Sequence, residues 1–341
     1  MPLRYGTGCN GFRSQRKFVK IGCMKFRTRT FLQILSIFFI FKASIFAWDD
    51  VGHKISAWIA WQRMSPSARN EVIRILRKAP EDSQLSALYA VYGPEPEETR
   101  QLEFFMLAAT WPDIVRNRDF PVRYRKYHRS NWHYADTFWK QVDGRVELLP
   151  DMQESGEAVI RLIEFDKTIR NPSASDPEKA IAIAWILHII GDLHQPLHTS
   201  ARVTDLEPKG DQGGNLFLLT PKDTPLEKQL NLHWFWDSIL NRVDPLVGNG
   251  CERIYIERLG RKFIKKYPYS LQTVRLSGFE DLQRESFSLN PKSVFTPDIV
   301  RFQMPSPKYT KHAYSVAEQR ITLAGYRLGD LLNEVFGKTV N

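Results

Sequence analysis

The pattern of hydrophobic and polar residues predicts α-helices along most of the chain after residue 47. Apolar residues recur every three to four positions in these segments, as they do on the buried face of a helix. Ser65-Pro66 and Asp176-Pro177 add helix-start signals, because a capping side chain comes directly before a proline. We predict helices at residues 53–64, 66–78, 101–109, 155–169, 177–194, 230–240, 251–266 and 313–336.

Polar segments separate these helices and are expected to be loops. Residues 80–100 are rich in Pro and Glu, residues 117–130 are basic and aromatic, and residues 200–230 are mostly polar. A short apolar run at 216–219 is the candidate for half of a small β-hairpin. No repeat or low-complexity linker divides the chain, so we expect an all-α fold: a single compact, mostly helical domain over residues 48–341 with long loops.

The start of the chain has the composition of an export signal. Nine Lys and Arg and no Asp or Glu occur in residues 1–47, a mostly apolar run spans residues 31–41, and a small residue, Ala47, follows. This run of eleven residues, with Gln33 and Ser36 among them, is too short to cross a bilayer, which takes about 20, so we predict a leader that is removed after Ala47. Met24 is an alternative start, because the segment from it to Ala47 has the usual signal length. The mature protein is then expected to begin at Trp48 and to be secreted or periplasmic, without a membrane anchor.

The formal net charge of +10 would by itself indicate a nucleic-acid partner, but most of the excess positive charge lies in residues 1–47. After residue 47, 39 of the 48 Lys and Arg remain against all 38 Asp and Glu. Charge therefore does not identify a partner for the mature chain, and any ligand must be inferred from a site. Cys251 is the only cysteine after residue 47, so a metal site there must consist mainly of His and carboxylate ligands.

Two histidine–aspartate pairs are notable for their spacing. His188 and Asp192 are four residues apart in one predicted helix, and at this spacing both side chains lie on one face. His233 and Asp237 repeat the spacing in another helix. One such pair is usually a surface contact, but these helices are otherwise apolar, and buried carboxylates need a cation or hydrogen bonds. Nitrogen and oxygen ligands without sulfur are typical of zinc, with manganese and iron as alternatives, so we predict a metal site.

Together with other histidines and aspartates, these pairs form motifs that resemble the secreted trinuclear-zinc nucleases of the S1/P1 type, in the phospholipase C/P1 nuclease superfamily. The resemblance extends from Trp48 to at least Asp237. The motifs are Trp48-x4-His53, Thr110-Trp111-Pro112-Asp113-x2-Arg116, Asn131-Trp132-His133-Tyr134-x-Asp136, His188-x3-Asp192-x5-His198 and Asn231-Leu232-His233-x3-Asp237.

The resemblance implies a mostly helical fold with three Zn²⁺ ions at the base of a cleft, and it implies a role for each matching position. Trp48 would bind through its free amine and its carbonyl oxygen, and Asp192 would bridge two of the ions. Arg116 matches a phosphate-binding arginine, and Asp136 matches its orienting carboxylate. Tyr134 would either stack on a base of the substrate or pack beside the cleft. The implied ligands are Asp113, His133, His188 and Asp192 for the first zinc, His198, His233 and Asp237 for the second, and Trp48, His53 and Asp192 for the third.

The resemblance also implies a phosphodiesterase reaction. Two zinc ions about 3.5–4 Å apart would share a water molecule and lower its pKa, and the resulting hydroxide would attack phosphorus in line. The expected substrates are single-stranded DNA and RNA, and the expected products are 5′-phosphorylated nucleotides. The same site would have 3′-nucleotidase activity. No stable protein partner is implied.

Two other functions fit parts of the sequence. The main alternative is a phospholipase C with the same trinuclear site, but that branch usually has glutamate as its last ligand and a longer spacing between its tryptophan and first histidine. Asp237 and the spacing from Trp48 to His53 favour the nuclease. The other alternative is a zinc-stabilised binding protein, which would need neither Arg116 nor Asp136.

Two neighbouring features are not assigned to the metal. His194 is six residues after His188, which is poor helical register, so we expect it to support the site or to lie at the surface. Gly213-Gly214 lacks the Gly-Lys-Ser/Thr that completes a phosphate-binding loop. By resemblance, these glycines would allow close backbone approach beside the cleft.

Overall fold

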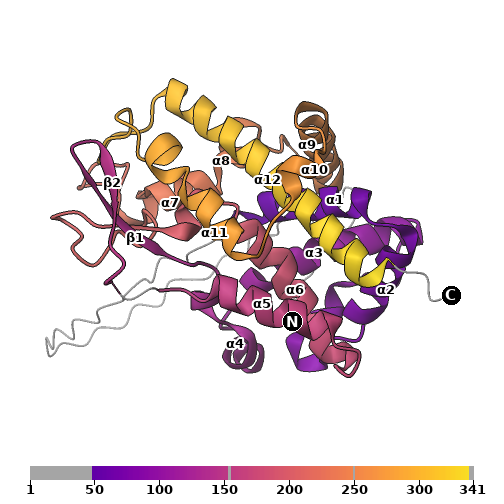
Figure 1. Cartoon of the computed structure of the whole chain (residues 1–341). Helices are drawn as coiled ribbons and strands as arrows, with labels where there is room; N and C mark the ends of the chain where they lie inside the picture. Colours follow the sequence, from indigo (N-terminus) through magenta and orange to yellow (C-terminus); the bar gives the residue numbers. More distant parts are fainter. Residues whose placement is uncertain (1–47, 153–154, 249, 338–341) are drawn as a thin grey trace, which may run out of the picture.

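The first and last helices of the described residues pack against each other through the centre of the protein. Helix α1 (Asp50–Arg63) lies along α12 (Pro307–Phe336), which crosses the molecule diagonally in Figure 1. Gly325 permits the close approach of the two helices, because a Cβ at this position would lie 2.6 Å from the Cβ of Ile59. The core is therefore built from both ends of the described part of the chain.

The computed structural model describes residues 48–152, 155–248 and 250–337. The predicted leader at residues 1–47 lies outside the described residues, so its removal after Ala47 stays a prediction. Within the described part of the chain, no helix is both long enough and apolar enough to cross a membrane.

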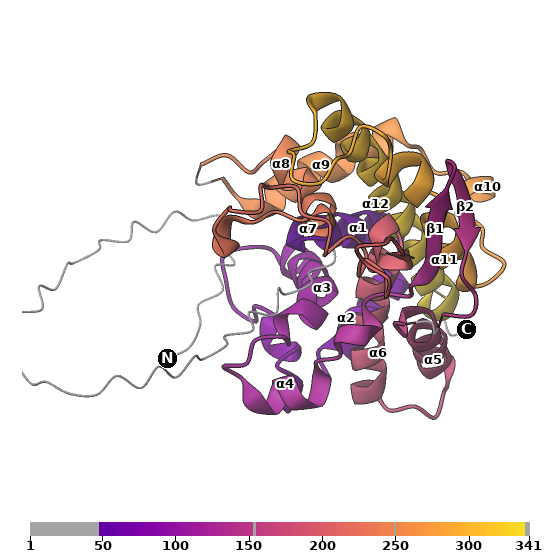
Figure 2. The ribbon, with the colours of Figure 1, turned by 90° about the vertical axis from the view of Figure 1, so that its left-hand side faces the viewer.

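Helix α6 (Asp176–Asp192) lies between several other helices, and Figure 2 shows α3 and α5 on two sides of it. Its start is fixed by a capping box, in which Ser175 and Glu178 each accept a hydrogen bond from the backbone of the other. Most of its side chains after the first turn are buried, so polar residues in its second half lie in the protein interior. The helices packed against it include α2 (Pro66–Leu76), α3 (Glu97–Ile114) and α5 (Ala158–Arg170).

The remaining helices are short, apart from α9. They are α4 (Pro121–Tyr127), α7 (Leu232–Asp237), α8 (Ile239–Val243), α9 (Glu252–Lys266), α10 (Leu271–Val274) and α11 (Glu280–Phe287). Single turns complete the set: η1 (Glu81–Ser83), η2 (Ser86–Leu88), η3 (Ser130–Trp132), η4 (Pro196–Thr199), η5 (Leu226–Lys228) and η6 (Asn290–Val294). The mostly helical architecture expected from the sequence is confirmed.

A small sheet of three strands lies at one edge of the protein (Figure 1). Strand β1 (Thr137–Val142) pairs antiparallel with β2 (Arg145–Leu148) and parallel with β3 (Ser200–Arg202). The turn between β1 and β2 is Asp143-Gly144, and both residues have positive φ, of 50° and 77°. Asp-Gly is typical of such a two-residue hairpin turn. The hairpin is therefore here and not at residues 216–219, where the described residues contain only a single bridge, between Leu218 and Asn231.

Two helix predictions and one loop prediction need correction, and the helix predicted at 313–336 begins earlier, at Pro307. The helix predicted at 101–109 runs as α3 from Glu97 to Ile114, and Pro112 lies inside its last turn instead of ending it. Residues 117–130, predicted to be a loop, contain α4, which starts at Pro121 with proline in its first turn. The helix predicted at 230–240 is divided into α7 and α8 at Ser238.

Candidate metal centre

Eight of the nine predicted ligand residues come together in the interior. Within each of three groups, nitrogen and carboxylate oxygen atoms lie within 4.8 Å of one another, and every member is buried. We call Asp113, His133 and His188 the first group, His198, His233 and Asp237 the second group, and His53, His188 and Asp192 the third group. The first and third groups share His188, so they form one continuous cluster.

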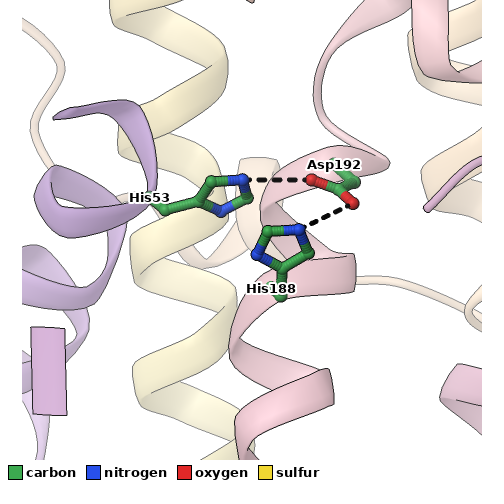
Figure 3. Close-up of side chains that lie close together, drawn as sticks. All are labelled: His53, His188 and Asp192. Carbon is green, nitrogen blue, oxygen red and sulfur yellow. Dashed lines mark ion pairs between the residues drawn. The ribbon is translucent and has the colours of Figure 1, made fainter. Parts of the chain in front are cut away.

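Asp192 is at the centre of this cluster. His53 comes from α1, whereas His188 lies one turn before Asp192 on α6, and both rings point toward its carboxylate (Figure 3). The His53 Nε2 atom is 3.1 Å from Asp192 Oδ1, and the His188 Nε2 atom is 3.3 Å from Oδ2. His133 Nδ1 also lies 3.1 Å from Oδ2. Three histidines from distant parts of the chain thus face one buried carboxylate.

Gly191 makes room for this arrangement. A Cβ at this position would lie 2.8 Å from His53 Nδ1, which is closer than real Cβ contacts. Because the glycine has no side chain, the His53 ring stacks on that of His188, with the ring centroids 3.9 Å apart. The approach of α1 to α6 therefore depends on the residue that directly precedes Asp192.

The second group combines η4 with α7. His233 and Asp237 lie one turn apart on α7, and the His233 Nε2 atom is 3.3 Å from Asp237 Oδ2. His198, in η4, places its Nε2 atom 3.7 Å from Asp237 Oδ1. The side-chain amide of Gln195 donates a hydrogen bond of 2.7 Å to the same Oδ1 atom. One oxygen of Asp237 is thereby occupied by Gln195, and the other faces His233.

Backbone carbonyls fix the orientation of three of the rings. In each case the Nδ1 atom lies 2.7 Å from a carbonyl oxygen, which favours the tautomer with the proton on Nδ1 and the lone pair on Nε2. The pairs are His188 with Ala109, His198 with His133, and His233 with Gly213. All three Nε2 lone pairs are consequently directed into the groups, as in metal-binding histidines.

The turn between α6 and η4 is also held by side chains. These come from α11, η6 and α12, and each donates to a carbonyl of the turn. Ser286 donates to Leu193, Arg320 to His194, and Asn290 to Pro196. This turn connects ligands of the cluster with a ligand of the second group, so the remote helices fix the relative position of the two.

Several atoms at the centre are buried and, among the described residues, have no hydrogen-bond partner. They are Asp192 Oδ1, Asp237 Oδ2, both nitrogen atoms of His53, and the Nε2 atoms of His133, His198 and His233. Buried polar atoms without partners are rare and costly. Most of these atoms point into the three groups, so the residues present fit bound metal cations with nitrogen and oxygen ligands.

Burial changes the protonation of these groups in the absence of metal. Burial raises the pKa of Asp113 to about 7 and that of Asp237 to about 6, against the ordinary value of 3.8. Burial also raises the pKa of Asp192 well above its ordinary value. The histidine pKa values are shifted down for the same reason, as for His188 and His133. Bound cations would reverse the carboxylate shifts, because they stabilise the charged form.

Trp48 and Asp49 enter the centre from the start of the described chain. Trp48 is buried, and Gly52 leaves room for it, because a Cβ there would lie 2.6 Å from that of Trp48. The Asp49 backbone N–H donates a 3.0 Å hydrogen bond to the carbonyl oxygen of Asp237. Trp48, the predicted mature N-terminus, therefore directly precedes a residue whose backbone is hydrogen-bonded to that of Asp237, a member of the second group.

Arg116 and Asp136 each have a close polar partner. The Arg116 guanidinium lies 3.0 Å from Asp113 Oδ1, one turn earlier in α3. The Asp136 carboxylate accepts a 2.6 Å hydrogen bond from the hydroxyl of Ser155, and burial raises its pKa to about 7. The Asp113 contact places Arg116 beside the first group, and the expectation that Asp136 orients Arg116 stays a prediction.

Tyr134 and His194 lie near the groups without belonging to them. Tyr134 is half-buried, and Gly156 passes close over it, since a Cβ there would lie 2.6 Å from the Tyr134 ring. His194 is buried and not at the surface: its Nδ1 atom donates to the Ile190 carbonyl, and its Nε2 atom accepts from Arg327. It belongs to the support of the α6–η4 turn.

The fold and the site together define a mostly helical, metal-binding protein whose candidate ligands come from α1, α3, α6, η4 and α7 and from the segment before β1. The family model of the S1/P1 nucleases matches residues 48–337, and the chain belongs to this family. It is therefore a nuclease, an enzyme that hydrolyses nucleic acid.

Three curated relatives are consistent with this assignment. Nuclease PA3 from Penicillium sp. and Nuclease P1 from Penicillium citrinum are each 21% identical to the chain over 313 residues, which covers 86% of this chain and 99% of each relative. Endonuclease 4 from Arabidopsis thaliana is 26% identical over 141 residues, which covers 38% of this chain and 41% of that protein.

Proposed function

We propose that residues 48–341 form a secreted or periplasmic zinc nuclease. It would hydrolyse single-stranded DNA and RNA to 5′-phosphorylated nucleotides and would also act as a 3′-nucleotidase. The observation that carries this proposal is the set of buried, partnerless nitrogen and oxygen atoms that point into the three groups. Their number and chemistry support three Zn²⁺ ions, one for each group.

The proposed ligand sets follow the groups, with two additions. Asp192 is added to the first group because its Oδ2 atom faces both His133 and His188. Trp48 is added to the third group through its amine and carbonyl oxygen, since the peptide after it is bonded beside Asp237. Asp192 would then bridge the ions of the first and third groups. The second ion would be held by His198, His233 and Asp237.

The side chains around the ions have separate tasks in this proposal. Zinc ions bound there lower the pKa of a coordinated water and neutralise charge on the phosphodiester. Arg116 binds the non-bridging phosphate oxygens with its planar fork of donors and stabilises the transition state. Asp113 keeps that fork in place through the 3.0 Å contact. Tyr134 is partly accessible and offers a ring on which an unpaired base stacks.

Asp136 keeps its proposed role as the carboxylate that orients Arg116. It is buried, and it is bonded to Ser155, in the segment next to the glycine that packs over Tyr134. With its pKa raised to about 7 by burial, it accepts or donates a hydrogen bond near neutral pH.

The experiment uses the mature protein starting at Trp48, with zinc measured by elemental analysis. Expected results are about three zinc ions per chain and cleavage of single-stranded oligonucleotides much faster than of duplexes. The products should carry 5′-phosphates by end-group analysis, and 3′-AMP should release phosphate. Release of phosphocholine from a phosphatidylcholine emulsion, without cleavage of DNA or RNA, would show the phospholipase instead. Zinc without any turnover would show a binding protein.

A further inference from the structure

We propose that Asp49 is a positioning residue that holds the mature N-terminus in the third group. This inference rests on the proposed function, because it requires Trp48 to be the first residue and a ligand. A chain terminus is ordinarily the most mobile part of a protein. A ligand located there loses conformational entropy when it binds, unless the fold already restrains it.

Asp49 is bonded through both its backbone and its side chain. Its N–H donates to the Asp237 carbonyl at 3.0 Å, and its carboxylate accepts a 2.6 Å hydrogen bond from the side-chain amide of Asn241. The carboxylate also caps α1 by accepting from the Gly52 N–H at 3.3 Å. We call the contacts of Asp49 with Asp237 and Asn241 the Asp49 clamp. It connects the start of α1 with the segment from Asp237 to α8.

The clamp limits where the Trp48 amine can be. Consecutive Cα atoms are about 3.8 Å apart, so fixing residue 49 confines residue 48 to a short arc. Burial of the indole ring fixes the side chain of Trp48, whereas the clamp fixes the peptide that follows it. Together these restraints limit the positions that the amine and the carbonyl oxygen can take before any metal binds.

The clamp also couples two metal groups. Asp237 contributes its carboxylate to the second group, and its carbonyl oxygen holds Asp49. Asp49 in turn precedes the helix that carries His53 of the third group. Asp49 therefore connects the second group, through Asp237, with the third group, through the helix that carries His53.

The test compares three variants of the mature protein. Asp49→Ala removes the carboxylate that accepts the hydrogen bond from Asn241. Asn241→Ala removes the donor of the same hydrogen bond. Asn241 is exposed, so its replacement leaves the core intact. Asp50→Ala is the matched control. It removes the same charge one residue later, where Asp50 is exposed and makes only a 3.7 Å contact with Lys54.

Two measurements are made on each variant, and neither depends on activity. The first is the zinc retained per chain during titration with a chelator. The second is the rate at which an acylating reagent modifies the Trp48 amine near pH 7, followed by mass spectrometry of the N-terminal peptide, since the lysines are protonated at that pH. For Asp49→Ala and Asn241→Ala we expect one zinc to be lost at roughly 10- to 100-fold lower chelator strength, with several-fold faster acylation. Asp50→Ala should match the wild type.

A conservative replacement separates positioning from charge. Asn at position 49 keeps an acceptor for the Gly52 N–H, and the Asn241 amide can turn so that its oxygen accepts from the new amide. Asp49→Asn should therefore restore most of the zinc retention and most of the amine protection. If Asp49→Ala behaves like Asp50→Ala in both measurements, the clamp has no positioning role. If the metal-loaded wild type is acylated as fast as the metal-free protein, Trp48 is not a ligand, and both the clamp and that part of the proposed function fail.

Discussion

The side-chain amide of Gln195 joins the two segments that build the second group. Its nitrogen donates to Asp237 Oδ1 at 2.7 Å, and its oxygen accepts from the Leu197 N–H at 2.6 Å, directly before His198. Gln195 is fully buried, so both bonds are protected from water. One side chain thus fixes a ligand on α7 relative to a ligand in η4.

We expect Gln195→Leu to weaken the second group selectively. It leaves Asp237 Oδ1 and the Leu197 N–H without partners, and loss of such a supporting contact typically lowers metal affinity 10- to 100-fold. Elemental analysis after dialysis against a weak chelator should show about two zinc ions instead of three. Gln229→Leu is the control, because that side chain bonds only to a loop carbonyl, that of Thr224. Full zinc retention in Gln195→Leu would contradict the prediction.

Asp192→Asn should remove metal and activity together. The substitution keeps the shape of the side chain but removes the charge that the first and third groups share. Zinc content should fall below two per chain, and hydrolysis of single-stranded DNA should fall with it. Asp166→Asn, which disrupts only the exposed ion pair with Arg170, serves as the control. Three retained zinc ions with near-normal turnover would exclude a bridging role.

Arg116→Ala should separate binding of metal from catalysis. Arg116 contacts Asp113 but is not one of the proposed metal ligands, so zinc content should stay at the wild-type value. The kcat should fall by a factor on the order of 10²–10³, the usual loss for one transition-state donor. Arg118→Ala, two residues later and exposed, is the matched control, and its guanidinium lies over the Tyr124 ring. A loss of zinc in Arg116→Ala would show that the arginine maintains the site itself.

Zinc binding to the metal-free protein should release more protons at pH 6 than at pH 8. Burial raises the pKa of Asp113 to about 7 and that of Asp237 to about 6, so at pH 6 Asp113 is mostly protonated and Asp237 is about half protonated, and a bound cation displaces these protons. The terminal amine, with a pKa of about 7.7–8.0, adds to the difference. We expect about two fewer protons per chain at pH 8, measured with an indicator dye in weak buffer. Zinc affinity should therefore rise with pH over this range, and a release that grows with pH would contradict the assignment.

From the sequence, the set of residues that come together could be predicted better than the contacts that hold them. His188 and Asp192 are four residues apart within one helix, so their spacing alone predicts that both side chains lie on the same face. The carbonyl oxygens of Ala109 and Gly213 that orient two of the rings have no side-chain signature, because any residue supplies a carbonyl. Their role depends on how separate elements pack, which spacing alone does not contain.

The misplaced hairpin has a physical cause. The Asp143-Gly144 turn is a strong hairpin signal, but it joins two short strands in which Trp139 is the one buried residue, so their hydrophobic pattern is weak. The expected pairing of Asp136 with Arg116 comes from a resemblance and stays a prediction. Ser155, which bonds Asp136, is nineteen residues away in a polar segment without regular structure, where spacing gives no information.

The packing of α1 against α12 has a consequence for how the chain is made. Residues that touch across this pair, such as Ile59 and Gly325, are more than 250 positions apart, and contacts between such distant residues form late in folding. During synthesis on the ribosome, α1 cannot pack against α12 until this last helix has been made. The core therefore cannot form while the chain is still being synthesised, and neither can the third group, to which α1 contributes His53. The proposed export of this protein is compatible with this topology, because a chain whose core needs its last helix cannot complete its fold until it is fully synthesised.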